Sequence, residues 1–350
     1  MLFKKSRLIL IIFLLLLFIC IGIFAFNIKI TTNKNSSLKV EGIKHDILIG
    51  TAVNVDALNN DAEYKKKIRE EFSIITPENE MKFSVVQPKF NEFTFDNADR
   101  IVEFAEKNEI KVRGHTLVWD KRIPDWLKNS NFTKEEAEQI LKNHIYTVVN
   151  RYKGRIYAWD VVNEAFNNDG SLKDSYWLRT IGPEYIKKSF IWAKEADPNA
   201  LLFYNDYSAE VTNEKSNAIF NLLKSLKNEK IPVDGIGFQF HTSLYQKFTE
   251  KEITTNMERF RDIGLKINVT ELDVKISDSN YSENLKLKKQ AEQYSVVLDS
   301  CKNLKGSCSV FSMWGFTDKY TWLRNDRPLL FNNEYEEKPS YNALKNILSK

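Results

Sequence analysis

The sequence predicts an α/β fold: a single-domain (β/α)8 TIM barrel, in which eight parallel strands alternate with helices and close into one sheet. Short apolar or β-branched runs alternate eight times with stretches of helical spacing. The chain's 350 residues exceed the ~250 that such a barrel typically needs. A doubly wound open sheet usually carries a G-x-G-x-x-G turn after its first strand, and none occurs here.

Each expected strand is a short run bounded by polar or turn-forming residues. The eight runs are Ile47–Asn54, Ser73–Thr76, Lys111–Trp119, Tyr157–Val162, Ala200–Tyr204, Gly235–Phe240, Lys266–Thr270 and Ser309–Trp314. Between them, Thr133 and Glu136 form a capping-box pattern that predicts the start of a helix. Asp197-Pro198 closes another helix, which begins near Glu184.

The N-terminus predicts export from the cytoplasm. Lys4, Lys5 and Arg7 precede Leu8–Phe26, nineteen residues without a charge. This run is longer than the apolar region of a secretory signal and reaches the ~17–25 residues of a membrane-spanning helix. We expect residues 1–30 to be a signal-anchor that crosses the membrane through residues 8–28, or alternatively a cleaved signal peptide. The protein is then held at the extracellular face of the membrane, or secreted.

Residues 31–45 are polar and lack periodic apolar positions, so we expect a linker there and the barrel domain over residues 46–350. Basic and acidic residues number 51 and 47 and are mixed along the chain, so no nucleic-acid partner is indicated. The four histidines are too scattered to predict a metal site, and no cofactor is expected. We expect the domain to act as a monomer.

Cys301 and Cys308, with six residues between them, are the only cysteines outside the N-terminal segment. In an exported protein this spacing allows a small-loop disulfide, and two free thiols are the alternative.

Polar side chains follow almost every expected strand, and active sites of such barrels form at the carboxyl ends of the strands. Among them, Glu164 ends strand four and Glu271 ends strand seven. These strands lie three steps apart in an eight-membered ring, so the two carboxyl groups can face each other across the barrel mouth. Two carboxyls ~5–5.5 Å apart are the arrangement of a retaining glycosidase. Mutual repulsion is expected to raise the pKa of one of them, and the acid is the natural candidate.

Four segments in this order make residues 46–350 resemble glycoside hydrolase family 10, the (β/α)8 endo-β-1,4-xylanases. They are Glu78-Asn79-Glu80-Met81-Lys82, Gly114-His115-Thr116-Leu117-Val118-Trp119, Trp159-Asp160-Val161-Val162-Asn163-Glu164 and Thr270-Glu271-Leu272-Asp273. The resemblance implies endo-hydrolysis of xylan by double displacement through a covalent glycosyl-enzyme intermediate.

The resemblance also implies roles for single residues. Glu164 is the acid/base and Glu271 the nucleophile, which His241 orients with Asp273 behind it. Asn163 binds the 2-hydroxyl of the sugar at the cleavage site. The other substrate-binding residues that it implies are Glu78 and Asn79 for the next sugar toward the non-reducing end, Lys82, His115 and Gln239 at the cleavage site, Trp314 and Trp322 as its walls, Tyr207 on the leaving-group side, and Trp119. Some relatives carry a disulfide where Cys301 and Cys308 fall, which favours the disulfide over free thiols.

The sequence departs from the family after Trp119, where Asp120 replaces a usual histidine and Lys121 and Arg122 replace smaller polar residues. The new carboxylate could alter the pKa of the acid/base. The two cations could pair with Asp120, meet acidic substituents on the glycan, or simply form an exposed loop. Three alternative functions remain: a β-1,4-glucanase on the same barrel, a catalytically inactive membrane-tethered glycan-binding protein, and a metal-dependent hydrolase.

Overall fold

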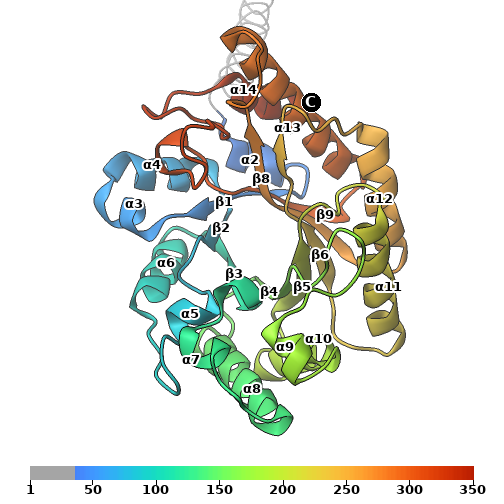
Figure 1. Ribbon diagram of the computed structural model, residues 1–350. Helices are drawn as coiled ribbons and strands as arrows, with labels where there is room; N and C mark the ends of the chain where they lie inside the picture. The colour runs from blue at the N-terminus through green and yellow to red at the C-terminus, as the bar shows by residue number, and fades with distance from the viewer. Residues whose placement is uncertain (1–35) are drawn as a thin grey trace, which may run out of the picture.

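A computed structural model describes residues 36–350, and its centre is a closed ring of eight parallel strands surrounded by helices (Figure 1). Neighbouring strands pair in chain order, and the ring closes where β1 pairs with β9 and β6 pairs with β8. The ring strands are β1 (Leu48–Val53), β2 (Ile74–Pro77), β3 (Lys111–Val118), β4 (Ala158–Asn163), β5 (Leu201–Asp206), β6 (Gly235–Phe238), β8 (Lys266–Lys275) and β9 (Cys308–Met313). The prediction of a (β/α)8 barrel is therefore confirmed.

The sixth and seventh strands differ most from the expected runs. Phe240 has a positive φ of 59°, which breaks the sixth run after Phe238. The chain then forms a short extra strand, β7 (His241–Ser243), which pairs with residues 273–275. For this reason β8 continues past Glu271 to Lys275, where the sequence predicted an end at Thr270.

Helices cover the outside of the ring between successive strands (Figure 1). The helix predicted after Thr133 is present with both hydrogen bonds of its capping box, and the one beginning at Glu184 ends before Asp197 as expected. The helices are α2 (Leu38–Ile43), α3 (Val55–Asn60), α4 (Ala62–Glu71), α5 (Phe83–Val86), α6 (Asp96–Lys107), η1 (Asp120–Arg122), α7 (Asp125–Lys128), α8 (Lys134–Arg151), α9 (Tyr176–Thr180), α10 (Glu184–Ala196), α11 (Glu214–Asn228), α12 (Glu250–Asp262), α13 (Glu283–Asn303), η2 (Asp318–Tyr320) and α14 (Pro339–Leu348).

The prediction of a polar linker over residues 31–45 is wrong for residues 38–43, which form helix α2. The side chain of Leu38 is fully buried, and its backbone N–H donates to the buried carboxylate of Glu71 at 2.9 Å. The Tyr341 hydroxyl donates to the same carboxylate oxygen, so α2 is tied to both α4 and α14. The folded domain therefore begins before residue 46. Residues 31–35 of the expected linker lie outside the described residues.

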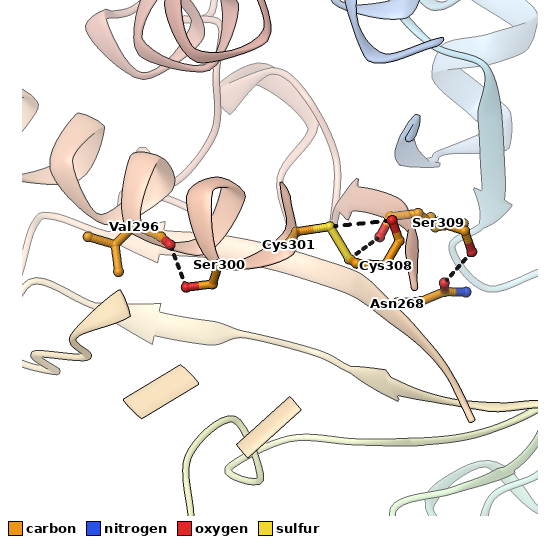
Figure 2. Close-up of a disulfide and its surroundings, with 7 residues drawn as sticks. Asn268, Val296, Ser300, Cys301, Cys308 and Ser309 are labelled. Atoms are coloured by element: carbon orange, nitrogen blue, oxygen red, sulfur yellow. Dashed lines mark hydrogen bonds between the residues drawn. A yellow bond between two sulfur atoms is a disulfide. The ribbon is translucent and has the colours of Figure 1, made fainter. Parts of the chain in front are cut away.

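Cys301 and Cys308 form the expected disulfide, which joins the end of α13 to the start of β9 (Figure 2). Both cysteines are buried. Cys308 lies at the amino end of its strand, so the bond closes the αβ turn on the side of the barrel away from the carboxyl ends of the strands.

The expected signal-anchor or signal peptide, residues 1–30, also lies outside the described residues. Within residues 36–350, none of the helices combines the length and the apolar character that crossing a membrane requires.

Candidate active site

A cavity of about 520 Å³ opens at the carboxyl ends of the barrel strands. The structure brings every predicted catalytic and substrate-binding side chain to its lining, together with two cations that follow Trp119. The lining residues are Glu78, Asn79, Lys82, His115, Trp119, Lys121, Arg122, Asn163, Glu164, Tyr207, Gln239, His241, Glu271, Trp314 and Trp322. Asp273 is fully buried behind His241.

Glu271 points into this cavity from β8, and the side chains of Asn205 and His241 hold its two carboxylate oxygens. Its Oε1 accepts from the Asn205 amide at 2.7 Å, and its Oε2 lies 3.1 Å from His241 Nε2. The other ring nitrogen of His241 lies 2.8 Å from Asp273 Oδ2, which also accepts from the indole N–H of Trp322. Burial disfavours a charged imidazole, but the charges and hydrogen bonds of Asp273 and Glu271 raise the pKa of His241 well above its ordinary value.

An amide network joins the surroundings of Glu271 to those of Glu164. Asn163 Oδ1 accepts from the amide groups of Asn205 at 2.9 Å and Gln239 at 3.2 Å, and the Gln239 amide also lies 3.5 Å from Glu164 Oε1. The amide nitrogen of Asn163 is buried without a hydrogen-bond partner in residues 36–350, so a donor is free at this point of the cavity. A Cβ at Gly237 would lie 2.3 Å from the Asn205 side-chain oxygen, so only glycine leaves room for this network.

Glu164 follows β4 with a positive φ of 56° and is 7% exposed. Its Oε2 lies 2.8 Å from Lys121 Nζ and 3.3 Å from Lys173 Nζ. Burial alone would raise the pKa of this carboxyl, but the hydrogen bonds and charges of the two lysines outweigh burial and lower it. The expectation that repulsion from Glu271 raises the pKa of the acid is therefore wrong for the protein without substrate.

The sequence left open an effect of Asp120 on Glu164, but Asp120 forms no hydrogen bond with Glu164 within residues 36–350. Its carboxylate accepts from the backbone N–H of Tyr176 at 2.8 Å, at the start of α9. Of the three alternatives for the two cations, pairing with Asp120 does not occur within residues 36–350. Lys121 pairs with Glu164 instead, while Arg122 lines the cavity and forms no ion pair within residues 36–350.

Comparison with known proteins identifies the family. A family model described as glycosyl hydrolase family 10 matches residues 37–347. The chain belongs to this family. Endo-1,4-beta-xylanase B of Thermotoga neapolitana is 41% identical over 342 residues, which cover 96% of each chain.

Solved structures of family 10 xylanases share the whole barrel. Xylanase 10B from Thermotoga petrophila RKU-1, in complex with xylobiose, superposes with a TM-score of 0.87 at 44% identity, and the match covers 90% of this chain and 98% of that one. Native xylanase 10B from Thermotoga maritima gives a TM-score of 0.86 at 45% identity, with 89% and 98% covered.

One wall of the family 10 cavity is an aromatic box around a buried amine. Lys82 Nζ lies 5.1 Å from the ring of Trp119 and 5.7 Å from the ring of Trp314, and it donates to the Asn79 side chain at 3.0 Å. Burial lowers the pKa of Lys82 to about 8. The edge of His115 meets Trp314, with ring centroids 5.1 Å apart. This wall therefore offers flat apolar faces and polar donors together, which is what a sugar ring requires.

Beneath the family 10 cavity, Arg113 and Asp160 form a buried ion pair inside the barrel, and Asp160 also lies 3.0 Å from His115 Nδ1. Within the described residues, no group of three or more histidine, cysteine or acidic side chains has the arrangement of a metal site.

The cleft extends past Trp322 into a second cavity of about 990 Å³ between the loop after β9 and the end of β1. Glu78 and Trp322 line both cavities, so the two spaces meet at these side chains. On the opposite side, Tyr207 lies beside three lysines, and the nearest amine, on Lys215, is 3.6 Å from the ring centroid. The site is thus a groove that continues beyond one sugar ring.

Two residues of the site, Asn205 and Lys173, were not predicted from the sequence. Asn205 is the second-last residue of β5 and the donor closest to Glu271, so its position directly after the predicted run Ala200–Tyr204 was a usable signal. Lys173 lies in the loop after β4 and is separated from Glu164 by nine positions. Nothing in its sequence context distinguishes it from the many surface lysines of the chain.

Proposed function

We propose that this protein is an endo-1,4-β-xylanase that cleaves internal xylosidic bonds of xylan with retention of anomeric configuration. The observation that carries the proposal is the shared cavity of Glu164 and Glu271, with the free amide donor of Asn163 among the groups that connect them. Family membership over residues 37–347 and the xylanase names of its relatives support the substrate class.

In the first step, Glu271 attacks the anomeric carbon while Glu164 gives a proton to the departing oxygen. Asn205 and His241 hold the two oxygens of Glu271, which aims the carboxylate at the sugar. In the second step a water molecule attacks the glycosyl-enzyme ester, and Glu164, now ionised, takes a proton from that water. The free N–H of Asn163 donates to the 2-hydroxyl, a contact that strengthens as positive charge develops on the ring.

Preference for xylose over glucose follows from the crowding by Trp314 and Trp322. Xylose lacks the hydroxymethyl group of glucose, so a site closed by two indole rings admits xylose and clashes with glucose. Trp314 is buried and fixed, while Trp322 is 51% exposed but is held by its N–H bond to Asp273.

The test compares Glu271→Gln with Glu135→Gln, a matched change at an exposed position of α8. Glu271→Gln should lower kcat on xylan by roughly 10⁴-fold or more, because the attacking carboxylate is lost, while xylo-oligosaccharide binding remains. Glu135→Gln should keep wild-type activity. NMR of the first product should show the β-anomer.

Three results would contradict the proposal. Unchanged turnover in Glu271→Gln would remove the assigned nucleophile. An α-anomer as first product would exclude double displacement. Faster hydrolysis of carboxymethylcellulose than of xylan would replace the substrate with a β-1,4-glucan.

We also propose that the enzyme works outside the cell, held at the membrane by residues 8–28, with secretion after cleavage as the alternative. Support comes from the nineteen uncharged residues after Arg7 and from the substrate, a polymer too large to enter a cell.

A further inference from the structure

Two lysines reach the same oxygen of Glu164, but they differ in how freely they can leave it. Lys121 Nζ lies 2.8 Å from Oε2 with its side chain 58% exposed, while Lys173 Nζ lies 3.3 Å away with its side chain 21% exposed. Lys121 is carried by η1, the short helical turn directly after Trp119. An exposed lysine can change rotamers at little cost, so Lys121 is the partner that can swing into solvent.

The ammonium of Lys121 also occupies the space beside the proposed leaving-group platform. Its Nζ lies 5.6 Å from the ring of Trp119 and 5.4 Å from the ring of Tyr207. A sugar that stacks on Tyr207 and presents its glycosidic oxygen to Glu164 needs this space. Substrate and Lys121 therefore compete for the same carboxylate.

We propose that Lys121 is a displaceable partner of the acid/base: it pairs with Glu164 in the empty site, and the leaving-group sugar displaces it. This inference rests on the proposed function and assigns Lys121 as a positioning residue, since it acts on the substrate through Glu164.

The displacement explains how Glu164 can carry a proton although a lysine ammonium lies beside it in the empty site. A general acid must carry a proton when the glycosidic bond breaks, yet an ammonium 2.8 Å away favours the ionised carboxylate. When the sugar moves Lys121 away, Glu164 takes one proton from solvent and gives it to the departing oxygen. After the leaving group has gone, Lys121 returns and favours the ionised carboxylate that the second step uses as base. Glu164 then removes a proton from water and releases it to solvent, so no net proton is consumed.

The other charged or titratable groups around Glu164 come from several elements, and all of them except Arg122 are partly or fully buried. Lys173 and Tyr207 lie on the leaving-group side, and the Lys173 amine is 3.5 Å from the Tyr207 hydroxyl. The remaining groups are His241 and Glu271 across the cavity, the Asp206–Lys215 pair behind Tyr207, and Glu78, Lys82, His115 and the exposed Arg122 in the cavity lining. Removal of Lys121 therefore changes one charge next to Glu164 and leaves the others.

The experiment measures the pH dependence of xylohexaose hydrolysis by wild type, Lys121→Met and Lys121→Arg, with Lys128→Met as the matched control on an exposed residue of α7. The basic limb of the pH profile of kcat/KM reports the pKa of the general acid in the free enzyme. The basic limb of the kcat profile reports its pKa in the enzyme–substrate complex. Lys121→Met should move the kcat/KM limb to higher pH by about one unit, since one opposite charge is lost, and leave the kcat limb in place. Lys121→Arg should restore the wild-type limb, and Lys128→Met should match wild type.

Two results overturn the proposal. An unshifted kcat/KM limb in Lys121→Met means that Lys121 does not set the state of Glu164. Equal shifts in kcat and kcat/KM mean that Lys121 remains beside Glu164 in the complex. Failure of the proposed function is a separate result, because wild type would then not hydrolyse xylohexaose.

Proton uptake gives an independent measurement. In the Glu271→Gln background, calorimetry in buffers of different ionisation enthalpy should show net proton uptake near neutral pH when xylohexaose binds across the cleavage site. The same titration with Lys121→Met added should show less uptake. Equal uptake in both proteins contradicts the displacement.

Discussion

At the residue scale, two histidines of this protein lie in environments that shift their pKa in opposite directions. His241 and His144 are both enclosed, but His241 faces the carboxylates of Glu271 and Asp273, while His144 stacks on Phe83 with ring centroids 3.4 Å apart. Burial lowers the pKa of His144 to about 3. The pKa of His241 is instead raised well above its ordinary value, because its two carboxylate partners outweigh burial.

These shifts predict opposite pH dependences of stability. A histidine whose pKa is higher in the folded than in the unfolded state contributes its full stabilisation below its unfolded pKa of about 6.5. This contribution disappears as the pH rises through the folded pKa. The stability that His241→Gln loses should therefore be largest below about pH 6.5 and should shrink in alkaline solution. For His144→Gln the loss should grow as pH rises from about 3 to about 6.5, since only the unfolded wild type binds a proton in this range.

Urea unfolding of the three proteins at several pH values from acid to alkaline solution measures both effects. Parallel pH curves for the two variants would show that the carboxylates do not hold a proton on His241.

Glu164 has an unusual backbone conformation, which sets the direction of its side chain. Its backbone has a positive φ of 56°, a conformation that costs a non-glycine residue about 1 kcal/mol or more. The backbone N–H of Glu164 donates to the carbonyl of Asn205, which fixes the turn after β4. The side chain thereby lines the cavity at the barrel mouth, where its Oε1 lies 3.5 Å from the Gln239 amide.

At the element scale, helix α2 extends the barrel domain beyond the eight repeats. It packs beside β1 and α14, so the beginning and the end of the described chain lie together (Figure 1). His45 follows this helix and contacts the backbone carbonyl of Leu348 at 2.7 Å.

We predict that a chain starting at Asp46 is less stable than one starting at Ser36 by about 2.5–6 kcal/mol, measured as the free energy of unfolding in urea. Loss of the buried Leu38 side chain contributes about 1.5–3 kcal/mol. Loss of a hydrogen bond to the buried Glu71 adds about 1–3 kcal/mol.

A matched pair of substitutions on α2 separates packing from chain length. Leu38→Ala should cost about 2–5 kcal/mol because Leu38 is fully buried, whereas Val40→Ala should change little because Val40 is 47% exposed. Equal unfolding midpoints for the two truncated chains would show that α2 is not part of the cooperative unit.

At the scale of the whole molecule, the barrel converts distant segments into one groove. The two cavities draw on the ends of β1 to β9, and they join at Glu78 and Trp322. A groove longer than one sugar ring suits cleavage within a polymer, because sugars on both sides of the cut find contacts.

The whole chain also carries its N-terminal apolar run. We predict that the full-length protein is recovered at its full mass in washed membranes of the producing cell. Replacing Leu14, Leu15 and Leu16 with arginine should release it, since each charge at the centre of a membrane helix costs about 2.5–3.5 kcal/mol. Recovery of wild type only as a shortened soluble form would reject the anchor and support a cleaved signal peptide.

The sequence by itself determined the barrel and most of the site. Strand runs recur at regular spacing, and in a parallel barrel every strand end lies on the same rim. For this reason Glu164, Glu271 and His241 could be brought together without coordinates. The disulfide was also expected, because Cys301 and Cys308 lie close in the sequence of a protein predicted to be exported and some members of the family that it resembles carry a disulfide there.

Only the tertiary structure decided what each side chain faces. Helix α2 has too few residues for a periodic pattern, so its burial against Glu71 depends on segments far away in the chain. The same holds for the partners of Glu164: whether Lys121 pairs with Asp120 or with Glu164 depends on the path of the loop that carries it. Charges act over a few ångströms in space, and positions in a sequence do not measure that distance.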